Sequence, residues 1–219
     1  MCKLLQWSLV TIPAPRTRRD ATENRAALLA AARVALNRDP DASLEAIAAE
    51  AGLSRRSVYG HFANRDELLR ELVSTGARRV GDALRSIEHA DPVVRLALVA
   101  SAFWHEVAHI RLMTVFAVRG PLKQHTDDAL RPMRDAVRAT LEAGRDAGDV
   151  RSDIPVSRLA RLAEDGLIAV LDESNRTPLG TAEGHRIAML SMLSTIGFGW
   201  REANAFIDSH EELSLKESL

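Results

Sequence analysis

Residues 43–62 read SLEAIAAEAGLSRRSVYGHF, and this stretch decides the fold of the N-terminal part of the chain. Ser43 can cap a first helix by accepting a hydrogen bond from a backbone N–H, and Glu45 suits the positive end of that helix. Gly52 then interrupts the pattern, and Ser54 can cap a second short helix. The first helix has the apolar stripe of an amphipathic helix: Leu44, Ile47, Ala48 and Ala51. Two helices joined by a short turn containing glycine are the sequence form of a helix-turn-helix.

The second helix, over 55–62, carries polar side chains on the side that we expect to face solvent. Arginine presents paired donors that match O6 and N7 of guanine, whereas Ser, Tyr and His suit phosphate oxygens. The side chains expected outside or at the edge are Arg55, Arg56, Ser57, Tyr59 and His61. The pattern favours double-stranded DNA as a partner, but a solvated helix in a helical interaction module would look the same.

The flanking residues extend the pattern from Arg25 to Leu69. They include Leu28, Leu29, Ala31, Ala32, Ala35 and Leu36 before the motif, and Asn64, Arg65, Glu67, Leu68 and Leu69 after it. Together with Ile47-Ala48, Ala51-Gly52-Leu53-Ser54 and Val58-Tyr59-Gly60-His61-Phe62, they resemble the DNA-binding domain of the TetR family of transcriptional regulators. The sequence departs from the family pattern in the loop over 37–41, at Arg56, which replaces a small residue, and at Gly60, which replaces a large one.

The resemblance implies a transcriptional regulator that is no enzyme and needs no cofactor or metal. It implies a homodimeric repressor that a small-molecule effector releases from a pseudo-palindromic operator. Residues 55–59 would enter the major groove. The backbone phosphates would be held by Ser43, Tyr59, His61 and Arg65.

Composition agrees with a helical protein. The 219 residues are only 4% aromatic, and Ala and Leu abound, so we expect an all-α fold. The single cysteine, Cys2, excludes an intramolecular disulfide and fits a cytoplasmic setting. Up to Arg65 there are 10 Lys and Arg against 6 Asp and Glu, and beyond it 19 against 24. A basic end on an acidic body is expected when only one end meets phosphate. The apolar run over 96–100 is far too short to cross a membrane.

The chain divides into a helix-turn-helix domain and a larger helical domain for effector binding and dimerisation. The expected boundaries are a basic, disordered tail over 1–19, the DNA-binding domain over 20–65, the larger domain over 66–209 and a polar, frayed tail over 210–219. Helices are expected over about 22–37, 44–51, 55–62, 64–87, 93–117, 127–147, 155–173 and 181–207. The resemblance implies that the last two long helices pair with those of a second subunit.

A different motif lies in the middle of the chain, where His105, Glu106 and His109 match H-E-x-x-H. On a helix, the two imidazoles would share one face and could hold zinc while the glutamate activates water. The extended form of this signature needs Gly and His where Leu112 and Val115 stand. We therefore keep a zinc-dependent hydrolase only as the alternative function.

The same region offers candidates for an effector pocket, because it combines aromatic, polarizable and hydrogen-bonding side chains. These candidates are Phe103, Trp104, His105, His109, Met113 and Phe116. Filling of the hydrophobic core is the alternative role for each of them.

Overall fold

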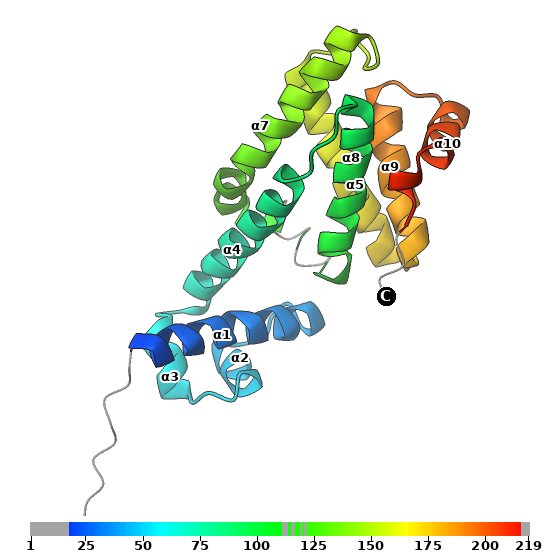
Figure 1. Cartoon of the computed structure of the whole chain (residues 1–219). Helices are drawn as coiled ribbons and strands as arrows, with labels where there is room; N and C mark the ends of the chain where they lie inside the picture. Colours follow the sequence, from blue (N-terminus) through cyan, green and yellow to red (C-terminus); the bar gives the residue numbers. More distant parts are fainter. Residues whose placement is uncertain (1–17, 111–113, 115–116, 119, 121, 216–219) are drawn as a thin grey trace, which may run out of the picture.

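The computed structural model describes residues 18–110, 114, 117–118, 120 and 122–215. Within these residues every regular element is an α-helix or a short 3-10 helix, and no strand occurs (Figure 1). The prediction of an all-α fold is thereby confirmed. Of the expected N-terminal tail, residues 1–17 lie outside the described residues, and the backbone is helical from Arg18 onwards. None of the helices in the described part has the length and apolarity needed to cross a bilayer.

The N-terminal unit consists of three helices and the start of a fourth (Figure 1). They are α1 (Arg18–Arg38), α2 (Leu44–Glu50), α3 (Arg55–His61) and α4 (Arg65–Arg85). Each of the last three begins at the side chain that the sequence indicates. The hydroxyl oxygens of Ser43 and Ser54 accept from the backbone N–H groups of Ala46 and Ser57, and the Asn64 amide oxygen accepts from that of Glu67. These caps fix where the helices start.

A small hydrophobic core holds these helices together. Its fully buried side chains come from all four helices and include Leu28, Ile47, Val58, Phe62 and Leu68. Between α2 and α3 the chain turns at Gly52, whose φ of 66° is in the left-handed region that glycine tolerates best. The helix-turn-helix predicted from residues 43–62 is present.

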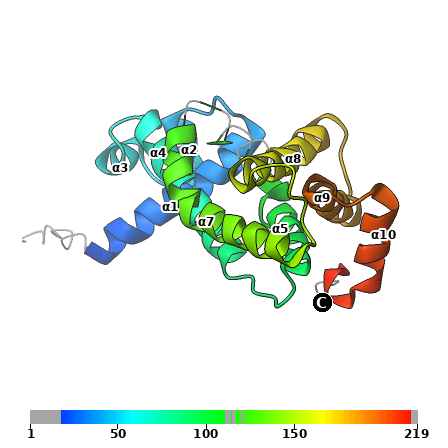
Figure 2. The ribbon, with the colours of Figure 1, turned by 90° about the horizontal axis from the view of Figure 1, so that it is seen from above.

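The larger domain packs around a second core, formed by the C-terminal half of α4 and the later elements. These are α5 (Pro92–Val107), η1 (Ala108–Ile110), α7 (Lys123–Ala147), α8 (Val156–Arg176), α9 (Thr181–Ile196), α10 (Trp200–Ser209) and η2 (Glu211–Leu213). Seen from above, α5 lies between α7 and α9, and α10 forms the outer edge beyond α9 (Figure 2).

Two helices are shorter than the sequence predicts. The helix expected over 93–117 ends as α5 at Val107, where the backbone continues as the 3-10 turn η1. The helix expected over 181–207 is divided into α9 and α10 at Gly197, whose φ is 125°. Left-handed glycines end helices because they allow backbone N–H groups to turn back. Here the N–H of Phe198 donates to the carbonyl of Leu193.

The end of the described chain is also more ordered than a frayed tail. Leu213, in η2, is only 1% exposed, and its carbonyl oxygen lies 2.9 Å from Nε2 of the buried His185 in α9. The stretch up to Leu213 therefore packs against the larger domain, because an apolar residue inside a polar sequence supplies an anchor.

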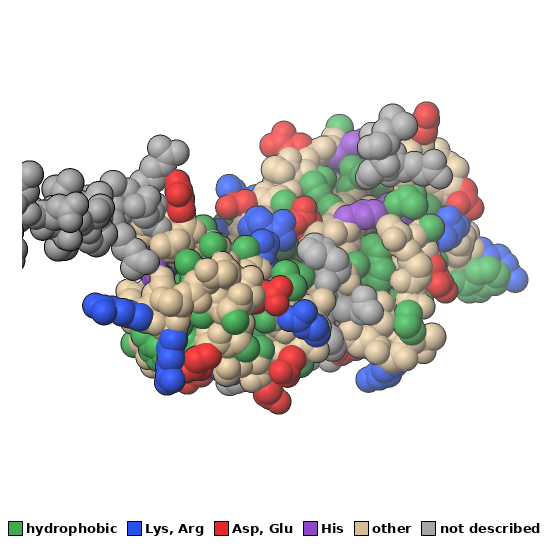
Figure 3. All heavy atoms as spheres, turned by 90° about the horizontal axis from the view of Figure 1, so that it is seen from below, with side chains coloured by type: hydrophobic (Ala, Val, Ile, Leu, Met, Phe, Trp, Pro, Cys, Tyr) green, Lys and Arg blue, Asp and Glu red, His purple; other side chains and the backbone are tan. Residues whose placement is uncertain are grey.

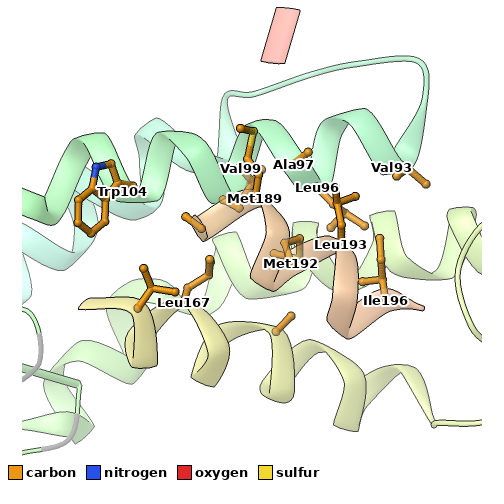
Figure 4. Close-up of a cluster of buried hydrophobic side chains, with 14 of the residues drawn as sticks. Val93, Leu96, Ala97, Val99, Trp104, Leu167, Met189, Met192, Leu193 and Ile196 are labelled. Carbon is orange, nitrogen blue, oxygen red and sulfur yellow. The ribbon is translucent and has the colours of Figure 1, made fainter. Parts of the chain in front are cut away.

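The helices α5 and α9 pack closely against each other in the larger core. In Figure 4 the α9 side chains Met189, Met192 and Leu193 lie between α5 and Leu167 of α8. Towards the other end of α5, Trp104 is 3% exposed and its indole ring lies directly against the backbone of Gly184. Because glycine has no side chain, α9 can approach this ring closely.

We predict that Gly184→Ala destabilises the protein. The added Cβ would overlap the buried Trp104 ring, and overpacking of a core typically costs about 1–3 kcal/mol in unfolding free energy. The control is Gly76→Ala in α4, where an added Cβ meets no atom within 4 Å. Removing a helical glycine there should stabilise by about 0.5–1 kcal/mol. Thermal and denaturant unfolding measure both, and equal melting temperatures for the two variants would contradict the packing argument.

Candidate DNA-binding surface and effector cavity

A carboxylate of α2 holds the solvent-facing side of α3. The Tyr59 hydroxyl donates to Oε1 of Glu45 at 2.9 Å, and Nη2 of Arg55 lies 3.3 Å from the same oxygen. The Arg55 guanidinium also lies 5.6 Å from the centre of the Tyr59 ring. The hydrogen bond from Tyr59 is the main cause that lowers the pKa of the Glu45 carboxyl group. Glu45 therefore orients two of the predicted DNA-contacting side chains, a role that its place in the first helical turn does not reveal.

The other candidates on α3 are not equally accessible. Arg56 is exposed, Tyr59 is 45% exposed, and His61 is half-buried. Ser57, which we expected outside or at the edge, is only 4% exposed, and its Oγ has no hydrogen-bond partner among the described residues. It lies beside Val58 on the inner side of this two-turn helix, so that side is wider than the apolar residues alone indicate.

Arg65, at the start of α4, contacts the loop before α2. Its Nε donates to the carbonyl of Ala42 at 3.0 Å, and its Nη2 donates to the carbonyl of Pro40. The side chain therefore joins the N-terminus of α4 to the loop that precedes Ser43. The guanidinium therefore donates to backbone carbonyls of the same chain, an intramolecular role that the sequence pattern does not indicate.

Arg25 of α1 positions the other end of α3. Its Nε donates to Glu71 of α4 at 2.8 Å, and its Nη1 donates to the carbonyl of His61 at 2.6 Å. The guanidinium stacks over the Phe62 ring at 4.3 Å, and the hydrogen bond to Glu71 is the largest cause that raises the pKa of Arg25. Arg25 thus links α1, α3 and α4 through one side chain.

Viewed from below, the molecule shows positively charged side chains projecting at the end that α3 occupies (Figure 3). Acidic side chains lie beside them, in agreement with the contact between Glu45 and Arg55. The accessible cations on α3 are therefore Arg55 and Arg56, of which Arg55 has an acidic neighbour.

A cavity of about 260 Å³ lies in the larger domain, between α4, α5, α7 and α8. Its wall is mostly apolar. The lining side chains include Leu72, Val80, Val99, Phe103, Val107, Leu130, Met133, Val137, Leu167 and Ile168. On α5 these residues recur at every fourth position, Val99, Phe103 and Val107, so one stripe of the helix faces the cavity.

The predicted pocket residues are divided by this geometry. Phe103 lines the cavity, whereas Trp104 and His105 do not, because successive residues of a helix point about 100° apart. Trp104 packs against α9, and His105 lies beside His185 of α9. Met113, Phe116 and the side chain of His109 lie outside the described residues.

His105 belongs to a small polar cluster between α5 and α9. Its Nε2 lies 3.0 Å from Nδ1 of His185, which also lies 3.0 Å from Oγ of Ser101. Nε2 of His185 faces the Leu213 carbonyl, so it carries the proton and Nδ1 accepts. Burial, and secondly the neighbouring His185, lower the pKa of His105.

Two residues of the H-E-x-x-H motif, His105 and Glu106, contact different neighbours. Glu106 forms an ion pair with Arg79 of α4 at 2.5 Å, whereas His105 faces α9. In the described part of the chain no three His, Cys, Asp or Glu residues are grouped so that they could hold a metal ion.

We predict that acidification destabilises the protein through His105. The folded state lowers the pKa of this imidazole below its ordinary value of 6.5, so the unfolded chain binds the proton more readily. The contribution of His105 to the unfolding free energy is therefore fully present above pH 6.5 and is lost as the pH falls below 6.5 towards the lowered pKa of the folded state. His105→Gln keeps a donor for His185 and should flatten the pH dependence below pH 6.5.

Urea unfolding over this pH range measures the effect. His125→Gln, at an exposed position of α7, is the control and should keep the wild-type dependence. If His105→Gln behaves like the control, the folded state does not lower the pKa of His105 as argued.

Helix-turn-helix geometry, an exposed basic α3 and a cavity-containing helical domain together define a class: two-domain, all-helical proteins with an N-terminal DNA-binding motif. The family model described as "Bacterial regulatory proteins, tetR family" matches residues 27–72. Over these residues the chain is similar to the DNA-binding domain of the TetR family.

Solved structures share the fold over most of the chain. The regulator FadR from Bacillus subtilis, in complex with stearoyl-CoA, is 16% identical, with a TM-score of 0.68, and the match covers 78% of this chain and 97% of FadR. LfrR from Mycobacterium smegmatis, in complex with proflavine, is 20% identical, with a TM-score of 0.65 and coverage of 83% and 99%. SmeT, the repressor of the Stenotrophomonas maltophilia multidrug efflux pump SmeDEF, is 23% identical, with a TM-score of 0.61 and coverage of 78% and 87%. No curated protein matches the sequence.

Proposed function

We propose that the protein is a cytoplasmic, homodimeric repressor that binds a pseudo-palindromic DNA operator and leaves it when a small molecule enters the larger domain. The observation that carries this proposal is the helix α3, which presents Arg55, Arg56 and Tyr59 at one end of the molecule. No chemical step is part of this function.

In this proposal Arg56 reads a base, because it is exposed and can form two hydrogen bonds to guanine in the major groove. Arg55 does so only if it exchanges Glu45 for DNA, and Tyr59, Ser43 and His61 contact phosphates. The Arg65 guanidinium donates to backbone carbonyls of the loop before α2, and in this proposal it also contacts a DNA phosphate next to that loop. Buried Ser57 supports α3 from within.

A second copy of the chain would pack against α8 and α9. Leu162 of α8 is 45% exposed, which is unusual for a large apolar side chain. An added Cβ at Gly166 would approach Oγ of Ser191 to 2.7 Å, so small residues let α8 and α9 pack closely. A two-fold dimer places its recognition helices about 34–36 Å apart, or a multiple of this distance.

The effector would act through α4. Leu72, Val73, Gly76 and Val80 of this helix line the cavity, and the same helix begins at Arg65 in the DNA-binding unit. FadR and LfrR, which share the fold, were found with stearoyl-CoA and proflavine, and we infer that this cavity is likewise the effector site. A ligand shifts the DNA-binding equilibrium only by its different affinities for the two states.

The proposal is tested by selecting bound fragments from sheared DNA of the source genome and titrating the best fragment at two salt concentrations. A short two-fold-symmetric site, bound well above scrambled DNA and weakened by salt, would support it. If no symmetric site is enriched, with or without cell extract as a source of co-ligand, the proposed function is wrong.

We predict that Arg56→Ala weakens operator binding by about 1–3 kcal/mol and relaxes the preference at one base position. Arg145→Ala, at the far end of α7 from α3, is the matched control and should bind as the wild type does (Figure 1). Binding to a set of operators mutated one base at a time provides the measurement. An unchanged base preference in Arg56→Ala would exclude this residue as a reader of sequence.

A further inference from the structure

The cavity combines an apolar wall with an excess of cationic side chains. Four arginines line it, Arg33, Arg134, Arg138 and Arg161, against a single carboxylate, that of Glu164. Arg134 and Arg138 lie one turn apart on α7, Arg161 and Glu164 lie one turn apart on α8, and Arg33 comes from α1. Four cationic side chains and one carboxylate thus border an otherwise apolar chamber.

Two of these arginines are already neutralised. Arg134 donates to Glu164 through Nε at 2.8 Å and Nη2 at 2.5 Å, and through Nη1 to Asp127 at 2.9 Å. Arg138 forms an ion pair with Asp135 at 2.5 Å. The acids near the cavity are therefore occupied by these two side chains.

Arg161 and Arg33 differ from them. Neither side chain forms a hydrogen bond or ion pair with another residue in the described ranges. Both residues are exposed, and both border the cavity. Their guanidinium groups are available to a ligand whose body fills the apolar chamber beside them.

We propose that the effector is an amphipathic organic anion, with an aliphatic body in the cavity and one carboxylate at the Arg161 and Arg33 side. This inference rests on the proposed function only in assigning the cavity as the effector site. Guanidinium groups bind carboxylates through two parallel hydrogen bonds, and such charge-assisted bonds are stronger than neutral ones. An ammonium ion would instead be repelled, and a neutral head group would gain less.

The size of the cavity limits the aliphatic body. Ligand pockets usually measure roughly 300–1,000 Å³, so a chamber of about 260 Å³ suits a small or medium body. Apolar contact is worth about 0.8 kcal/mol for each buried CH₂ group, so affinity should increase with chain length until the chamber is full.

The two free arginines also connect the head group to DNA binding. Arg33 belongs to α1 of the DNA-binding unit, whereas Arg161 belongs to α8 of the larger domain. Because both side chains line the same cavity, a ligand bound there that contacts both units would favour one arrangement of them, which is the differential affinity that release from DNA requires.

The test compares three ligands of equal chain length: decanoate, decanol and decylammonium. Calorimetry measures their binding to the full-length wild type, Arg161→Gln, Arg33→Gln and the control Arg158→Gln. Arg158 is exposed on α8, one turn before Leu162, and does not line the cavity. Thermal unfolding without ligand checks that each variant is folded.

We expect decanoate to bind the wild type about tenfold or more tightly than decanol, with decylammonium weakest. Arg161→Gln should lose about tenfold for decanoate and little for decanol, whereas Arg158→Gln should change neither. Equal binding of decanoate and decanol, or tighter binding of decylammonium, would overturn the proposal, as would failure of decanoate to bind at all.

These outcomes are separate from those of the DNA experiment. Wild type that binds its operator but prefers decanol would refute the anionic effector and leave the regulator intact. Decanoate binding that depends on Arg161, in a protein that selects no operator, would support the anion site and refute the proposed function.

Discussion

The helix α4 belongs to two hydrophobic cores at once, and the arrangement of the molecule depends on this constraint. Leu68 and Leu72 are buried with α1, α2 and α3, while Val80 and Leu84 are buried with α5 and α7. A continuous helix transmits a rotation or shift from one end to the other, since its backbone hydrogen bonds prevent local bending without a kink. In the proposed mechanism, movement of the cavity wall at Val73 or Gly76 would reach Arg65 through α4. The contacts of Arg65 with the carbonyls of Pro40 and Ala42 would pass it to the loop that carries Ser43.

The DNA-binding unit compensates for its small core with polar contacts at its periphery. Arg25 joins three helices, Arg65 joins α4 to the loop before α2, and Glu45 joins α2 to α3. Exposed ion pairs contribute little to stability, so these contacts matter more for the orientation of the helices than for the free energy of folding. They fix the orientation of α3 relative to α1, α2 and α4. If α3 meets DNA as proposed, the negative charge of Glu45 beside Arg55 would oppose the approach of phosphate and would weaken non-specific binding.

The sequence predicts the features that local interactions determine. The helix starts at Ser43, Ser54 and Asn64 follow from caps within three residues, and the helix-turn-helix follows from an apolar period over one short stretch. The misplaced features depend on residues far apart in the chain. The inner position of Ser57, the orientation of Trp104 towards Gly184 and the break at Gly197 are set by which neighbour each side chain meets. The cavity could not be assigned from 103–116 alone, because its wall is shared by helices that lie far apart in the sequence. The recurrence of the apolar residues Val99, Phe103 and Val107 at every fourth position was the sequence signal for the side of α5 that faces the cavity.

The contact of Leu213 with His185 fastens the turn η2 to the larger domain. The turn η2 packs against α5 and α9, with the Leu213 side chain buried and its backbone carbonyl beside the buried His185 imidazole. A peptide tag joined beyond residue 215 would leave this turn in place. Truncation after Ser209 would remove it, leaving the imidazole without its acceptor and part of the larger core open to water, so shortened versions of the protein would be prone to aggregate through that end.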